Sequence, residues 1–173
     1  ALAAAHDLET DPLQRTTLQR EAAEHYLRAG HFDRGVEALK EVMGELGLTY
    51  PASPRSALTM FITSRAALAL RRGRVAEPKA DGGVPARDLA RLDACWAGVV
   101  GFTLVDSMRS AAFQARYTRL ALAAGEPVRV LRALSTEVAF RAGMGGGGNR
   151  IRSRAVLRQV DSLVKLQEDP TVA

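Results

Sequence analysis

A glycine-rich run from Gly143 to Gly148 matches the spacing G-x-G-x-x-G of a dinucleotide-binding loop. That motif works only after a strand, which aims the following helix N-terminus at a pyrophosphate. Here a predicted helix precedes the run. Asn149 and Arg150 also stand where a phosphate-binding loop requires Lys and then Ser or Thr. We therefore interpret residues 143–148 as a flexible break between helices and expect no nucleotide or other cofactor.

Histidine and cysteine offer little further chemistry. The histidines are His6, His25 and His31, and no two are spaced to place ligands on one helix face, so we expect no metal. The single cysteine, Cys95, lies in an apolar run over residues 94–105 with no histidine near it in sequence. Such a thiol is normally an inert packing residue. We expect no catalytic residue in this segment.

Charged residues form two patterns. Glu37, Glu41 and Glu45 recur every four positions, which places them on one face of a helix as a solvated stripe that a basic partner could meet. The second pattern is a basic start to a predicted last helix, where cations oppose the helix dipole and pairing with a partner or a neighbouring helix is favoured. Its members are Arg150, Arg152, Arg154 and Arg158.

The elements that would position such residues are helices, and a helical hairpin over residues 22–43 is the clearest of them. Gly30 can end the first helix in left-handed geometry, and Gly35 lets the second helix approach closely. We expect Phe32 to pack back into the hairpin. The buried stripe of the second helix is expected to comprise Val36, Leu39, Val42 and Met43.

Small residues at these places are typical of a tetratricopeptide-type hairpin, although any antiparallel helix pair would satisfy the same pattern. Helices are predicted over residues 12–29, 33–46, 54–70, 86–105, 108–124, 128–142 and 149–167, with a loop over 74–85. No strict repeat period continues past Gly47. We predict one all-α domain over residues 1–173, a degenerate tetratricopeptide-like array of antiparallel hairpins, that is, an α-solenoid.

Composition narrows the function classes. The 173 residues carry a net charge of +5, from 24 basic and 19 acidic residues. Nearly all of the positive charge is arginine scattered among the acids, which argues against a nucleic-acid surface. One cysteine excludes an internal disulfide, and the apolar run over 94–105 is shorter than the roughly 20 residues of a membrane helix. With no secretory signal and Ala1 in place of Met, we expect a cytoplasmic fragment of a longer chain.

Four segments together carry a family resemblance: Glu21–Leu48, Arg91–Trp96, Asp106–Arg116 and Leu120–Pro127. Over nearly its whole length the chain resembles the tetratricopeptide-like helical region of very long bacterial serine/threonine protein kinases that also carry an AAA-type ATPase module. The chain contains no His-Arg-Asp, Asp-Phe-Gly or Walker motif and no glycine-rich loop followed by its lysine. No catalytic residue is therefore carried over from the family.

The expected function is a non-catalytic protein-interaction or regulatory region, a sensor or scaffold, of such a kinase. Its partner would be a protein, a peptide or another domain of the parent chain, with no membrane involved and the oligomeric state left open. We expect Glu24, Arg28, Arg34 and Glu37 to be exposed positions that contact the partner. The alternative is a helical domain of a transcription regulator that binds nucleic acid with a steep salt dependence.

Overall fold

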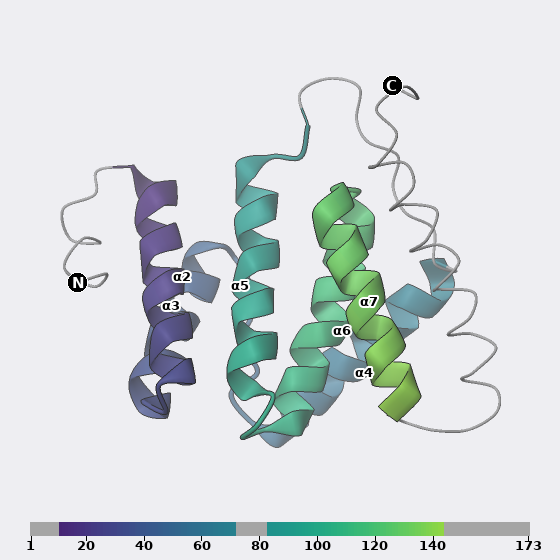
Figure 1. Cartoon of the computed structure of the whole chain (residues 1–173), viewed down its shortest axis with the longest axis horizontal. Helices are drawn as coiled ribbons and strands as arrows, with labels where there is room; N and C mark the ends of the chain where they lie inside the picture. The colour runs from purple at the N-terminus through teal and green to yellow at the C-terminus, as the bar shows by residue number, and fades with distance from the viewer. Residues whose placement is uncertain (1–10, 72–82, 144–173) are drawn as a thin grey trace.

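The computed structural model describes residues 11–71 and 83–143, and every regular element in these two ranges is an α-helix (Figure 1). The helices are α2 (Pro12–Arg28), α3 (Phe32–Glu45), α4 (Pro54–Arg71), α5 (Ala86–Phe102), α6 (Ser107–Ala124) and α7 (Pro127–Gly143). The predicted all-α class is confirmed for this part of the chain. None of these helices is long and apolar enough to cross a membrane.

Local capping chemistry explains where the helices begin and end. The Asp11 carboxylate accepts a hydrogen bond from the Leu13 amide at 2.9 Å, with Pro12 in the first turn of α2. The Asp106 carboxylate accepts one from the Arg109 amide at 2.9 Å and begins α6. Gly30, with φ +82°, ends the α2–α3 turn in left-handed geometry, as predicted.

The predicted helix over residues 86–105 is three residues too long. α5 ends at Phe102, and its carbonyl accepts the amides of Val105 at 3.2 Å and Asp106 at 2.9 Å in a tight turn. Asp106 has to leave helical geometry to cap α6, so the chain unwinds before it. The turn holds Leu104 almost completely in solvent.

Helix packing follows chain order except at α4. α2 and α3 pair as a hairpin, α5 packs against both of them, α6 packs against α5, and α7 packs against α6. α4 follows α3 in the chain but packs against α6, and in Figure 1 it passes behind α6 and α7. Hairpin pairing is therefore present at α2–α3 and α5–α6, while α4 departs from a simple succession of hairpins.

The largest group of buried apolar side chains draws on all six described helices, with most of its members on α5 and α6. Leu39, Val42 and Met43 of the predicted stripe are fully buried, and Val36 packs partly buried against the same cluster. Phe32, which we expected to pack back into the hairpin, is 37% exposed and is not part of this core. The α2–α3 turn is so short that α3 begins at Phe32 itself, which leaves the ring in the first helical turn at the hairpin's edge.

A buried polar cluster joins three helices on the other side of the molecule. The Glu137 carboxylate of α7 accepts hydrogen bonds at 2.7 Å from Arg65 of α4 and at 3.0 Å from Gln114 of α6. Arg141, one turn further along α7, donates to the same carboxylate. Burial pushes the pKa of Glu137 up, but the Arg65 charge and these hydrogen bonds outweigh it and hold the pKa below 4.5.

Several predictions fall outside the described residues. They concern His6, the loop over residues 74–82, residues 144–148 of the glycine-rich run and the basic segment 150–158. Of the predicted loop, residues 83–85 are described and lead into α5. Gly143 is the last residue of α7.

Candidate functional site

An open groove of about 800 Å³ lies between α3 and the turn that joins α5 to α6. One wall comes from α3 between Phe32 and Glu41, and the other from the end of α5, the turn and the start of α6. We call it the α3 groove. Its lining residues are Phe32, Asp33, Val36, Glu37, Lys40, Glu41, Phe102, Val105, Asp106 and Arg109.

The groove has an apolar floor that water reaches. Val105 is 51% exposed, and Phe32 lies across from it on α3. Val36 and the buried Phe102 continue the same surface inward. Next to Val105 in the turn, Leu104 is 96% exposed. Exposed large apolar side chains gathered at one place are typical of a protein-interaction surface.

Carboxylates line the α3 wall. Asp33, Glu37 and Glu41 are spaced one helical turn apart and are all exposed. Glu41 also accepts a hydrogen bond from the Gln19 amide of α2. The neighbouring member of the predicted acidic stripe, Glu45, accepts one from the Thr16 hydroxyl at 2.7 Å, so the end of the stripe holds the hairpin together.

The two cations of the groove are engaged with the protein itself. Arg109 donates to the carbonyls of Pro51 and Ala52, both at 3.1 Å, and to the Asp106 carboxylate at 2.9 Å. The Lys40 ammonium lies 5.4 Å from the centre of the Tyr50 ring. Lys40 remains exposed, as do the three carboxylates of α3, and of these carboxylates Asp33 and Glu37 have no hydrogen bond or ion pair to another described residue.

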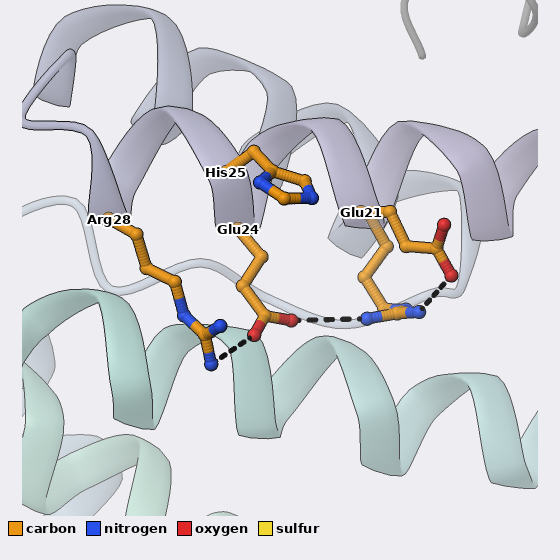
Figure 2. Close-up of a pocket in the computed structure, with 5 residues that line it drawn as sticks. Glu21, Glu24, His25 and Arg28 are labelled. Atoms are coloured by element: carbon orange, nitrogen blue, oxygen red, sulfur yellow. Dashed lines mark hydrogen bonds and ion pairs between the residues drawn. The ribbon is translucent and has the colours of Figure 1, made fainter.

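A second surface, on α2, is neutralised internally. Figure 2 shows the Glu24 carboxylate between Arg28 and a second guanidinium, which belongs to Arg20, at 2.8 and 3.3 Å respectively. Glu21 pairs with Arg20 at 3.1 Å, and His25 lies exposed beside this row (Figure 2). Because each carboxylate already has a cation, the row offers no unpaired charge to a ligand.

The structure separates the four residues predicted to contact a partner. Glu37 lines the α3 groove. Arg28 is exposed but belongs to the α2 ion-pair row, and the guanidinium of Arg34 lies 4.5 Å from the centre of the Tyr26 ring. The prediction that Glu24 is exposed is wrong: its side chain is 18% exposed because two arginines cover it.

Sequence reasoning missed the apolar half of the groove. The predicted helix over residues 86–105 includes Val105, the last residue of the apolar run, which the structure places in the turn beside the groove. The signal against that assignment is Asp106, since a helix N-cap directly after the run requires a turn before it. Asp33, one turn before Glu37, was also open to prediction from the helical period alone.

Much of the arginine content serves the fold. Five arginines of the described ranges donate to main-chain carbonyls: Arg71 to Leu122, Arg87 to Glu45, Arg91 to Leu46, Arg109 to Pro51 and Ala52, and Arg116 to Thr49. Several of these carbonyls belong to the last turn or cap of a helix, where acceptors lack a partner within the helix. Guanidinium groups used in this way do not assemble a phosphate-binding surface.

Cys95 and the possible metal ligands of the described residues are the next candidates for chemistry. Burial raises the pKa of the Cys95 thiol to about 12, although nearby Arg116, Arg119 and Arg91 act to lower it. A thiol with that pKa is protonated at neutral pH and is no nucleophile. Within residues 11–71 and 83–143, no three His, Cys, Asp or Glu side chains are grouped so as to hold a metal ion.

Comparison of the chain with protein-family models, with curated proteins and with solved structures gives no match.

Proposed function

We propose that this chain is a non-catalytic protein-interaction region and that the α3 groove receives the partner. The observation that carries the proposal is the exposed apolar lining of the groove, to which α3 contributes Phe32 and the α5–α6 turn contributes Val105. Aromatic and aliphatic side chains of this kind are the anchors around which protein interfaces are built. Covering them releases water from apolar surface, which is the main favourable contribution to association.

We further propose a tetratricopeptide-like, solenoid type of construction. The packing of α5 against both helices of the α2–α3 hairpin supports it, since the first helix of a following repeat packs in this way. α4 would then be an insertion between two hairpins. The wider setting, a cytoplasmic regulatory arm of a bacterial serine/threonine kinase with an ATPase module, rests on the sequence resemblance.

The interaction is tested by site-specific photo-cross-linking in cells that make the parent chain. A photo-reactive phenylalanine replaces Val105 in the groove or, as a matched control, the equally exposed Val128 on α7. We expect a discrete adduct with a second polypeptide, or with another domain of the parent chain, from position 105 only. The substitution Phe32→Ala is expected to remove most of that adduct while leaving the helical circular dichroism unchanged.

Equal adducts from positions 105 and 128, or an adduct that survives Phe32→Ala, would contradict a specific groove interaction. The non-catalytic part of the proposal has its own test. The purified chain is expected neither to hydrolyse ATP nor to transfer phosphate. Turnover that disappears when a residue of this chain is substituted would contradict that expectation.

A further inference from the structure

We infer that the partner segment that fits the α3 groove is a cationic amphipathic helix, with Lys or Arg along one stripe and apolar side chains beside it. This inference rests on the proposed function and names the chemistry of the partner. It depends on three features of the groove: the charges left free, the apolar floor and the kind of backbone that forms the walls.

The charges that line the groove are negative on balance, with Asp33, Glu37, Glu41 and Asp106 against Lys40 and Arg109. Asp33 and Glu37 are exposed on successive turns of α3, and neither carboxylate has an ion pair among the described residues. Arg109 is bound to the carbonyls of Pro51 and Ala52, while Lys40, whose ammonium lies 5.4 Å from the centre of the Tyr50 ring, is exposed and opposes these carboxylates only in part. A partner therefore meets carboxylates that are ready to form ion pairs.

This local charge is opposite to that of the chain, whose net charge is +5. A cationic segment is repelled by the molecule in general and attracted at the α3 groove. That contrast favours one docking place over others and increases the association rate at low salt. Nucleic acid would be repelled at the groove, because its phosphates would face the carboxylates of Asp33 and Glu37.

The spacing of the two carboxylates fits a helix. Asp33 and Glu37 are four residues apart, so cations four residues apart on a helix laid along α3 can meet both. The apolar residues Phe32, Val36 and Val105 lie beside them and would take the adjoining apolar stripe. An extended peptide has less to bind, since the described residues contain no strand edge to which it could add.

The inference is tested with three fluorescein-labelled synthetic peptides of equal length and fluorescence anisotropy. One is a cationic amphipathic helix with lysines four residues apart beside a leucine stripe. The second keeps the leucines and replaces each lysine by glutamate. The third has the first peptide's composition in scrambled order. Each is titrated with the wild-type chain at low and high NaCl concentration.

Four variants of the protein complete the design. Asp33→Asn/Glu37→Gln neutralises the groove, and Val105→Ser and Phe32→Ala alter its floor. The matched control, Glu21→Gln/Asp88→Asn, removes the same number of negative charges from exposed side chains outside the groove. All the altered side chains lie at the surface, so we expect each variant to fold, and circular dichroism checks that it does.

We expect the cationic helix to bind the wild-type chain about tenfold more tightly than the groove-neutralised variant, the size expected for two exposed ion pairs. The control variant should bind as the wild type does, the floor variants more weakly, and high salt should weaken binding. Equal binding of the cationic and glutamate peptides would overturn the inference. So would equal losses in the groove-neutralised and control variants.

The two proposals fail in distinguishable ways. A cross-link from position 105 without binding of the cationic helix would overturn this inference and leave the proposed function standing. Absence of both would overturn both.

Discussion

At the scale of single residues, glycines mark the places where helices touch. A Cβ on Gly35 of α3 would lie 2.6 Å from the Leu27 Cγ, and a Cβ on Gly98 of α5 would lie 2.7 Å from the Phe113 ring. Leu27 also packs against Gly101 of α5, so one leucine fills the point where α2, α3 and α5 meet. The close contacts between these helices therefore require glycine at these positions, because a larger side chain would collide with Leu27 or Phe113.

Two glycines of α3 give a matched pair of substitutions. Gly35→Ala is expected to lower the free energy of unfolding by about 1–3 kcal/mol, because the new methyl group displaces Leu27. Gly44→Ala meets no atom within 4 Å and should raise it by about 0.5–1 kcal/mol through helix propensity. Urea unfolding followed by circular dichroism measures both. A stabilising Gly35→Ala would show that Leu27 moves aside without cost.

At the scale of helices, the position of α4 depends on a buried charge cluster. Arg65 brings its guanidinium to Glu137, whose side chain is almost completely buried on α7, and Gln114 of α6 completes the contact. The ring of Phe140 lies 4.6 Å from the same guanidinium. Since breaking a buried ion pair leaves an uncompensated charge, this cluster fixes how α4 crosses α6 and α7.

The stability of the protein is expected to fall at acid pH because of Glu137. Its folded pKa lies below 4.5, so the unfolded chain takes up the proton first. The stabilisation is fully present above pH 4.5 and is lost as the pH falls through the folded pKa. Glu137→Gln should cost about 3 kcal/mol at pH 7, and this difference should shrink as the pH falls below 4.5 and through the folded pKa. Urea unfolding at several pH values measures it.

The exposed Glu21→Gln serves as the control and should change stability little at any pH. A constant penalty for Glu137→Gln from pH 7 to pH 3 would mean that the side chain acts through its shape and hydrogen bonds and that its charge contributes nothing.

Helix positions could be predicted from the sequence because caps and turn glycines act locally. Asp11, Gly30 and Asp106 each act within a few residues of their own position. The packing of α4 could not be predicted from the sequence. Arg65 and Glu137 are 72 residues apart in the chain, and nothing near either residue in the sequence indicates that they form a pair. The acidic side of the groove could be predicted from the helical spacing of Glu37 and Glu41, whereas Val105 could not, because it lies in a turn that the sequence did not reveal.

At the scale of the whole molecule, α5 joins the α2–α3 hairpin to α6, since it contacts all three of these helices. It carries Cys95, the only cysteine of the chain, with no exposed surface. A side chain in this position becomes accessible only when the helices around it separate. The thiol therefore reports on the integrity of the entire core.

Native-state thiol labelling tests this arrangement. With the pKa of Cys95 raised to about 12 by burial, Ellman's reagent is expected to react no faster than the protein unfolds globally. The labelling rate should rise with urea in parallel with the unfolding rate measured by circular dichroism. Stoichiometric labelling within the mixing time in native buffer would show that α5 is reached through local opening.

The contact of α4 with α6 has a consequence for synthesis on the ribosome. α6 is complete only about fifty residues after α4 has ended. At about 5–20 residues per second, translation of that interval takes about 3–10 s. Throughout it, the newly made α4 displays Ala57 and Met60, which the finished protein buries. The apolar side chains of α4 thus stay exposed on the nascent chain until α6 is made. Segments of this type are the ones that ribosome-associated chaperones shield.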